Sequence, residues 1–217
     1  MPEILSEVEA RIVGALVEKQ LTTPEYYPLT LNALVNACNQ KNNREPVVSY
    51  NESIVTQALE ALRDRNLVYV FYGSTSRVPK YKHMLPSIYE LEPSEVAVLD
   101  VMLLRGPQTL GELRGRTERL YDFHGLGEVQ ETLDGLIRRD DPLIVKLPVQ
   151  PGQKEARFAH LLSGEIDVDA IAAQVSRPAR DGGSSERLEK LEGEVERMKT
   201  ELESLRETFD EFKKQFE

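Results

Sequence analysis

An internal repeat constrains the fold of this chain more than any other feature of its sequence. The Ser-Glu-Val segment at Ser94 repeats the one at Ser6 with an offset of 88 residues. The offset falls to 79 between the Thr-Leu pairs at Thr109 and Thr30, and to 74 for the apolar positions that follow. Two copies of one supersecondary unit explain this pattern. The shrinking offset means that the first copy is longer around its second helix, within Thr22–Val47.

The first copy predicts three helices. Ser6 and Glu9 have the spacing of a capping box, and an apolar stripe at helical spacing follows them. Thr30 is a suitable N-cap for a second, shorter helix. Ser49 and Glu52 have the spacing of another capping box, which would open the third helix. Each helix has one apolar face, so we expect the three to pack around a common core.

The segments between and after these helices predict extended structure. Gln20–Pro28 contains two prolines, which disfavour helix in the residues before them, so we expect an extended connector. Leu67–Tyr72 and Val78–His83 are rich in β-forming residues around a Gly-Ser turn and predict a β-hairpin. Pro79 has no N–H to donate and therefore indicates an edge strand. Three helices followed by a hairpin are typical of a winged helix.

The second copy predicts the same order of elements and ends in a hairpin at Leu143–Leu147 and Ala156–His160. We therefore predict a mainly α (α+β) fold with two tandem winged-helix domains, followed by a linker and a C-terminal coiled-coil helix. The linker is rich in Ser, Gly, Pro and Asp and has little periodicity. The predicted boundaries are 1–88 for the first domain, 89–163 for the second, 164–185 for the flexible linker and 186–217 for the coiled coil.

The last segment of the chain has a regular heptad pattern. Its apolar residues alternate spacings of three and four, which keeps one seam facing a partner helix and predicts a homo-oligomer. A helix that packs back on its own domains is the alternative, although such helices usually have a wider apolar stripe. The oligomerisation candidates are Leu188, Leu191, Val195, Met198, Leu202, Leu205, Phe209, Phe212 and Phe216.

Composition limits the classes of function. The net charge is −10, divided as −1 over residues 1–90, −3 over 91–163 and −6 over 164–217. The acidity therefore lies mostly in the tail, and a local basic patch that binds nucleic acid stays possible on either domain. The single cysteine favours a reducing compartment, and no long apolar segment predicts a membrane span. We expect a soluble cytoplasmic protein.

Ordered sequence blocks resemble a known family. They are Glu18-Lys19-Gln20, Thr22–Leu29, Ala37–Lys41, Asn43–Val47, Leu103–Gly106, Gln108-Thr109, Gly111–Arg114 and the stretch with Leu161, Ser163, Gly164 and Glu165. On these blocks the chain resembles, over residues 5–165, the YceH-like family of uncharacterised bacterial proteins. The resemblance implies tandem winged-helix domains and a C-terminal coiled-coil region. It implies no established activity, substrate or catalytic residue.

Residues with catalytic chemistry are few and scattered. His83, His124 and His160 have no metal-ligand spacing, and no Gly-rich phosphate loop is present. Cys38 lies on the inward face of its predicted helix, where a packed thiol is expected rather than a nucleophile. The sequence therefore predicts neither an enzyme nor a cofactor or metal site.

DNA binding is the first functional hypothesis. A helix-turn-helix reads bases with the start of its recognition helix, and a wing contacts the phosphate backbone. The argument against it is that Glu52 lies where phosphate would approach, and that the amides near Asn43 could serve only to satisfy loop backbone groups. The DNA-binding candidates in the first domain are Lys41, Asn43, Arg44, Tyr50, Asn51, Ser53, Thr56, Arg77, Lys80 and Lys82.

A protein–protein scaffold is the alternative hypothesis. An acidic coiled coil and the Tyr26-Tyr27 pair suit a protein partner, although the tyrosines could equally pin the connector onto the helices. The sequence as a whole favours a non-enzymatic, transcription-associated factor that binds double-stranded DNA and self-associates through its tail. Thr22–Val47, where copy one exceeds copy two, is the segment in which we expect function to lie.

Overall fold

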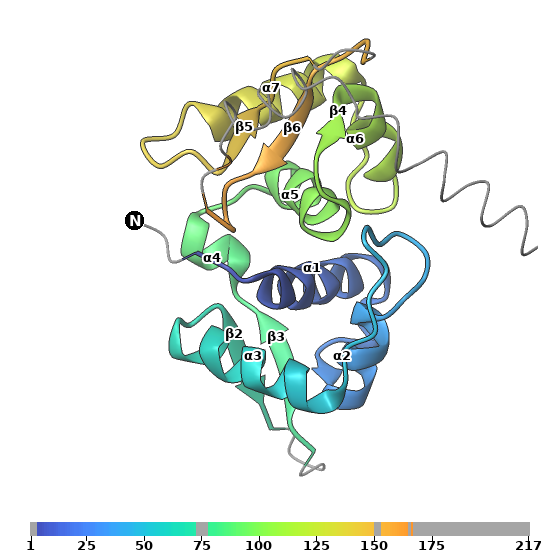
Figure 1. Ribbon diagram of the computed structural model, residues 1–217, viewed down its shortest axis with the longest axis vertical. Helices are drawn as coiled ribbons and strands as arrows, with labels where there is room; N and C mark the ends of the chain where they lie inside the picture. The colour runs from blue at the N-terminus through green and yellow to red at the C-terminus, as the bar shows by residue number, and fades with distance from the viewer. Residues whose placement is uncertain (1–3, 73–77, 150–152, 165, 167–217) are drawn as a thin grey trace, which may run out of the picture. The chain divides into compact units, whose positions relative to one another are not determined.

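The computed structural model describes residues 4–72, 78–149, 153–164 and 166 (Figure 1). All of these residues belong to one compact unit, which combines helices with small antiparallel sheets in a mixed α+β fold. The predicted coiled coil lies outside the described residues, as does the predicted linker except for residues 164 and 166.

The two halves of this unit repeat one order of elements. The first half consists of α1 (Glu7–Thr22), a 3-10 turn (Pro24–Tyr26), β1 (Leu29–Thr30), α2 (Leu31–Cys38), α3 (Glu52–Asp64), β2 (Val68–Phe71) and β3 (Lys80–His83). A short helix, α4 (Leu85–Tyr89), leads to the second half. The second half consists of α5 (Pro93–Arg105), β4 (Gln108–Thr109), α6 (Leu110–Arg116), α7 (Leu126–Ile137), β5 (Ile144–Lys146) and β6 (Arg157–His160).

The start of α1 agrees with the sequence prediction, and its end does not. The backbone N–H of Ser6 donates to Glu9 Oε2 over 2.7 Å, and the Ser6 hydroxyl accepts from the backbone N–H of Glu9, which confirms the capping box. The helix continues to Thr22, past the residue where we expected the connector to begin. The connector is not fully extended either, since Pro24–Tyr26 forms a turn of 3-10 helix with proline at its first position.

The predicted capping box at Ser49 and Glu52 is wrong. The N-cap of α3 is Asn51, whose Oδ1 accepts from the backbone N–H of Ile54 over 2.9 Å. The helix begins late because Tyr50 is held in place by another segment. The Asn39 side chain donates to the carbonyl of Tyr50 and accepts from its N–H, both over 2.8 Å. This amide pairing with the end of α2 takes the backbone groups that an earlier helix would have used.

The edge position predicted for the second strand of the first hairpin is also wrong. β3 is the central strand of its sheet, in the order β1-β3-β2, because the two-residue strand β1 pairs with its other side. Pro79 lies just before β3, where its missing N–H leaves no ladder position empty. The second half follows the same topology, with β6 between β4 and β5. Strands as short as β1 and β4 carry no sequence pattern of their own.

Helices α1 and α5 pack against each other and join the halves (Figure 1). The buried residues of both halves form one hydrophobic cluster. A Cβ atom on Gly14 would lie 2.8 Å from Leu104 Cδ2, so the absent side chain permits the close approach of the two helices. The predicted boundary after residue 88 falls within α4, inside this continuous core. The division into two domains stays a prediction.

Within the described residues, no helix has both the length and the apolar character that a membrane crossing requires. The cytoplasmic location stays a prediction from the sequence.

Substituting Gly14→Ala should lower the free energy of unfolding by about 1–3 kcal/mol, because the added methyl group meets Leu104 and overpacks the α1–α5 contact. Gly127→Ala is the matched control, since Gly127 is exposed in α7 and nothing lies within 4 Å of the added carbon. The control should stabilise by up to about 1 kcal/mol through helix propensity. Urea denaturation measures the free energy of unfolding of both variants. An equal increase in this free energy for the two variants would contradict the close contact between Gly14 and Leu104.

Candidate functional site

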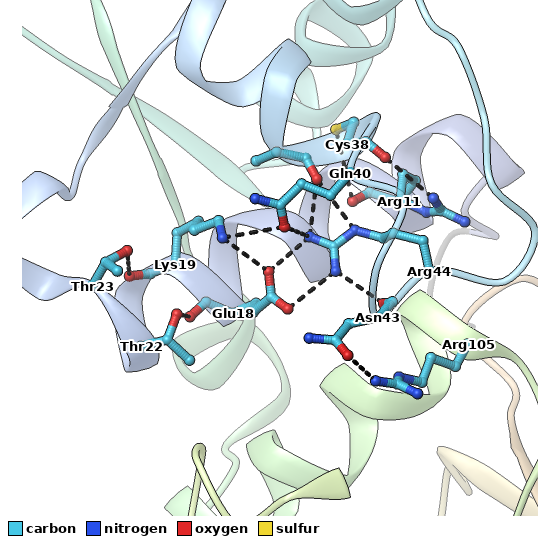
Figure 2. Close-up of polar contacts among 11 residues, drawn as sticks. Arg11, Glu18, Lys19, Thr22, Thr23, Cys38, Gln40, Asn43, Arg44 and Arg105 are labelled. Atoms are coloured by element: carbon cyan, nitrogen blue, oxygen red, sulfur yellow. Dashed lines mark hydrogen bonds and ion pairs between the residues drawn. The ribbon is translucent and has the colours of Figure 1, made fainter.

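The loop between α2 and α3 is held by a buried arginine. Arg44 is 4% exposed, and its Nη1 and Nη2 donate to the two carboxylate oxygens of Glu18 on α1, over 3.0 and 2.7 Å (Figure 2). Its Nε and Nη2 also donate to the carbonyl of Ala37 at the end of α2. Further donors reach the carbonyl of Asn43 and Oε1 of Gln40. The guanidinium nitrogens of Arg44 thus all donate hydrogen bonds to groups inside the protein.

Arg44 therefore does not serve as the phosphate contact that the sequence suggested. Its guanidinium is buried and paired, and freeing it would remove the two-pronged partner of buried Glu18 and leave only Lys19 beside that carboxylate. Burial alone would raise the pKa of Glu18. The hydrogen bonds and charge of Arg44, together with the charge of Lys19, outweigh burial and lower that pKa below its usual value of 4.5. The pair is structural, and it fixes the path of the loop.

A second buried arginine on α1 supports the same loop. Arg11 Nη1 donates to the carbonyl of Cys38 over 3.2 Å, and Nη2 donates to the carbonyl of Pro46 over 2.7 Å. Burial, and next the charge of Arg44, lower the pKa of Arg11. Arg11 and Glu18 are seven residues apart and so lie on one face of α1. On this face Arg11 donates to the carbonyl groups at the end of α2 and of the loop, while Glu18 accepts from Arg44.

The other loop candidates turn toward the second half of the unit. The Asn43 side-chain carbonyl accepts from Arg105 on α5 (Figure 2). The N–H of Glu45 donates to the carbonyl of Leu104 over 2.9 Å. Lys41 is exposed beside them. The β2–β3 hairpin instead packs against α3 and α1. Lys41 and Asn43 therefore do not form one surface with Lys80 and Lys82.

The start of α3 presents few groups suited to DNA. Asn51 uses its side-chain oxygen as the N-cap, Tyr50 is half-buried against the core, and Thr56 is half-buried, while Ser53 is exposed. The charged residues that α3 exposes are mainly acidic and would repel phosphate. They are Glu52, Glu60 and Asp64, against a single exposed arginine, Arg63.

The outer surface of the first sheet is more favourable. Tyr69 lies opposite Lys82, and Phe71 lies opposite Lys80, on the side of the hairpin that faces away from the core. We call these four residues the outer face. The alternate residues of the same strands, such as Val68 and His83, point inward. Tyr69 is 60% exposed and Phe71 is 46% exposed, so two aromatic rings and two lysines lie together at the surface. Arg77 lies outside the described residues.

Of the four residues considered for catalytic chemistry, Cys38 and His83 are buried, His160 is half-buried and His124 is exposed. Burial raises the pKa of Cys38 to about 12, and the thiol is packed beneath α1, which confirms that it is a core residue. Burial, and next the charge of Lys82, lower the pKa of His83 to about 4, and burial lowers that of His160 to about 4. Both imidazoles are neutral at pH 7. Among the described residues, no three His, Cys, Asp or Glu side chains are placed to hold a metal ion.

The tyrosine pair in the connector divides into two roles. Tyr27 packs against the core, and its hydroxyl accepts from the backbone N–H of His83 over 2.8 Å, so it pins the connector to β3. Tyr26 is 72% exposed. Burial raises the pKa of Tyr27 well above its usual value.

Sequence reasoning missed the buried charges of α1 and α5. Arg11, Glu18 and Asp100 are each at most 7% exposed, although each is ionisable. A signal for them exists, because α1 and α5 are apolar over most of their circumference and must be buried on several sides. A charge inside such a helix requires an internal partner. The identity of that partner, however, follows only from the tertiary structure.

Substituting Glu18→Gln should lower the free energy of unfolding by about 3 kcal/mol at pH 7, since Arg44 would be left buried without its counter-charge. Because the pKa of Glu18 is lowered on folding, its contribution is present above the usual value of 4.5 and lost as the pH falls through the lowered value. The difference between the two proteins should therefore shrink on acidification.

Urea denaturation between pH 7 and pH 3 measures this difference. The matched control is Glu60→Gln on α3, where the side chain is exposed and the expected change is within about 0.5 kcal/mol. Equal effects of the two substitutions, or a difference that grows on acidification, would contradict the buried ion pair.

Comparison with known proteins places the chain in a family. The family model described as "Protein of unknown function, DUF480" matches residues 5–153. A UPF0502 protein of Opitutus terrae is 54% identical over 179 residues, which cover 82% of this chain and 78% of the relative. A UPF0502 protein of Citrifermentans bemidjiense is 52% identical over 196 residues, 90% of each chain. A UPF0502 protein of Geobacter sulfurreducens is 46% identical over 220 residues and covers the whole of both chains.

These matches extend over both halves of the repeat and confirm the resemblance seen in the sequence blocks. The chain belongs to the DUF480/UPF0502 family of uncharacterised bacterial proteins.

Proposed function

We propose that the chain is a non-enzymatic, transcription-associated protein built from two tandem winged helices. Each half places a helix, a short strand, two further helices and two strands in the same order, with sheet orders β1-β3-β2 and β4-β6-β5. This is the element order of a winged helix, in which α3 or α7 would be the recognition helix and each hairpin a wing. The common topology of the two halves supports this interpretation.

The outer face of the first wing carries the proposal of DNA binding. Lys80 and Lys82 are separated by one residue on β3 and lie beside the exposed rings of Tyr69 and Phe71. Lysines on one side of a strand can neutralise neighbouring phosphates, and aromatic rings can pack against sugars or bases. We infer that the first wing contacts double-stranded DNA and that α3, whose exposed face is acidic, contributes little to affinity.

The second half of the unit is less suited to DNA than the first. The helix α7 begins with an exposed leucine and glycine, and Glu128 in its first turn accepts from the N–H of His124 over 2.7 Å. Arg157 on β6 forms an ion pair with Glu112 over 2.8 Å. Glu112 and Glu128 thus hold some groups of the second half within the protein, and the start of α7 is poorly suited to a polyanion. The proposal therefore confines DNA contact to the first half.

A protein scaffold is the second candidate. The observation that favours it is the apolar character of the surface around β2, where Tyr69, Phe71 and Tyr72 are 60%, 46% and 67% exposed. Aromatic residues in such numbers are also typical of protein interfaces. The two candidates differ in salt dependence, because phosphate contacts weaken with salt and apolar contacts do not.

The lysines of the outer face provide the test for DNA. Substituting Lys80→Ala together with Lys82→Ala should weaken binding to duplex fragments and reduce the slope of log K against log salt by about two, because each lysine would neutralise one phosphate. Fluorescence anisotropy with mixed genomic duplexes, from low to physiological salt, measures both quantities.

The matched control is Lys146→Ala with Arg138→Ala, which removes two exposed cations from the second half. It should leave the slope unchanged. An equal loss for both pairs would indicate nonspecific attraction. The scaffold proposal replaces the DNA proposal if two results are found together. The first is that the intact protein binds no duplex. The second is that the intact protein retains a protein from lysate at high salt, and that the variant Tyr69→Ser with Phe71→Ser does not.

We also propose that the chain self-associates through residues 186–217, which lie outside the described residues and have the heptad pattern of a coiled coil. Deleting this segment should reduce the solution mass by more than the mass of the residues removed. Light scattering at several concentrations measures the change. A second variant places charges in the middle of the predicted seam of the full-length chain, with Met198→Asp and Leu202→Asp, and should dissociate it equally. An unchanged oligomeric state in both variants would exclude the coiled coil.

A further inference from the structure

A polar pocket lies where α1, the α2–α3 loop, α5 and the end of α6 meet. Its volume is about 590 Å³. Lys19 and Thr22 line it from the end of α1, Asn42 lines it from the loop, Arg105 from α5 and Arg119 from the segment after α6. Its volume is within the range of about 300–1,000 Å³ that small-molecule sites occupy. Both halves of the repeat therefore contribute walls to one pocket.

The pocket is rich in positive charge, although the chain carries a net charge of −10. Five cationic side chains and three carboxyl groups line it. Two of the carboxyls are compensated, since Glu18 is paired with buried Arg44 and Glu118 lies 3.8 Å from Arg114. Two of the cations are paired as well, Lys19 with Glu18 and Arg116 with Glu112, each over 3.4 Å. The cations are Lys19, Lys41, Arg105, Arg116 and Arg119, and the carboxyls are Glu18, Asp100 and Glu118.

Asp100 is the most deeply buried carboxyl of this pocket. It is 1% exposed on α5, and its Oδ1 has no hydrogen-bond partner among the described residues. Burial, and next the charge of Glu18, raise the pKa of Asp100 well above its usual value of 3.8, while Arg44 and Lys19 oppose this shift. The raised pKa favours the protonated carboxyl, which can donate one hydrogen bond. A buried polar oxygen without a partner requires an explanation, and a bound ligand is one.

Amide side chains also line the pocket. Gln40 and Asn43 also line the pocket, and both already take part in the network around Arg44 (Figure 2). The Gln40 carbonyl accepts from Lys19 Nζ over 3.3 Å, and the Asn43 carbonyl accepts from Arg105. The neutral partner Asn43 therefore holds Arg105 toward the pocket, and this contact does not cancel the charge of the guanidinium. Lys19 also lies 3.4 Å from Glu18 Oε2, so its charge is partly compensated.

We propose that this pocket binds a small organic anion, a phosphorylated or carboxylated metabolite, between the two halves of the unit. Its oxyanion would lie among Lys41, Arg105 and Arg119, and an acceptor atom of the same molecule would take the hydrogen bond from Asp100. Direct contact of a nucleic-acid duplex with Asp100 is disfavoured, because this residue is only 1% exposed. The site is separate from the outer face of the first wing, so it does not depend on DNA binding.

Such a ligand would tie the two halves together. Lys41 comes from the first copy of the repeat, and Arg105 and Arg119 come from the second. A ligand that binds only the folded protein raises its stability as the free concentration exceeds the dissociation constant. The expected signature is therefore a melting temperature that rises with ligand concentration.

The test uses the full-length chain with two probes, pyrophosphate and citrate, at constant ionic strength. Isothermal titration calorimetry and thermal unfolding should both detect binding of at least one probe. A preference for pyrophosphate indicates a phosphorylated ligand, and a preference for citrate indicates a carboxylated one. The variant Lys41→Ala with Arg119→Ala should weaken binding at least about tenfold, since removing each charge-assisted hydrogen bond reduces affinity severalfold. These two side chains are exposed, so folding should be unaffected.

The matched control, Arg138→Ala with Lys154→Ala, removes two exposed cations that lie outside the pocket and should bind as the natural chain does. Asp100→Asn keeps a hydrogen-bond donor but cannot ionise. The affinity of the natural chain should therefore fall relative to this variant as the pH rises through the raised pKa of Asp100. Comparing the proteins at each pH removes the titration of the probe itself.

Three results would overturn the proposal. The first is that neither probe binds above the effect of matched sodium chloride. The second is that the Lys41 and Arg119 substitutions reduce binding no more than the control pair does. The third is that they weaken duplex DNA binding while leaving probe binding unchanged, which would assign these cations to nucleic acid. The outer-face lysines are intact in every variant, so loss of probe binding and loss of DNA binding can be distinguished.

Discussion

The buried ion pair between Arg44 and Glu18 determines how the first half of the unit is arranged. Arg44 reaches across from the loop to α1 and also takes the carbonyl at the end of α2. One side chain thus joins two helices and the loop that separates α2 from α3. Neither member could be buried alone, because an unpaired charge in this position would cost several kcal/mol. The path of the loop follows from this requirement.

The same pair links the first half to the second. The loop that Arg44 fixes donates a backbone hydrogen bond to Leu104 on α5 and accepts from Arg105. Close packing of α1 on α5 at Gly14 brings Glu18 near buried Asp100, whose pKa rises in part because of that charge. The loop insertion that distinguishes copy one from copy two therefore serves as a contact between copies. It is also one wall of the polar pocket.

Charge is distributed unevenly over this acidic chain. Cations gather at two places in the described residues, the outer face of the first sheet and the pocket between the halves. They differ in shape, since the first is an open sheet surface with exposed aromatic rings and the second is a concave site with a buried carboxyl. An extended polyanion suits the first and a compact anion suits the second. The two proposals therefore concern separate surfaces that can be altered independently.

The sequence by itself determined the repeated order of elements, the cap at Ser6, the N-cap at Thr30 and the inward face that buries Cys38. These features depend on residues a few positions apart, whose periodicity and capping chemistry are visible in the chain. The ordered sequence blocks were likewise sufficient to identify the family resemblance. Two local errors, at Ser49 and Pro79, arose where a distant segment competed for backbone groups: Asn39 held Tyr50, and β1 paired with β3.

Only the tertiary structure decided the roles of the charged residues. Arg44 and Lys82 are both cations in polar segments, yet one is buried against Glu18 and the other is exposed on a strand. Asp100 is one acid among many in the sequence, and its burial depends on α1, which lies more than 75 residues earlier in the chain. Local patterns cannot specify such pairings, because desolvation depends on which distant elements pack together. The candidate sites of this protein follow from that packing.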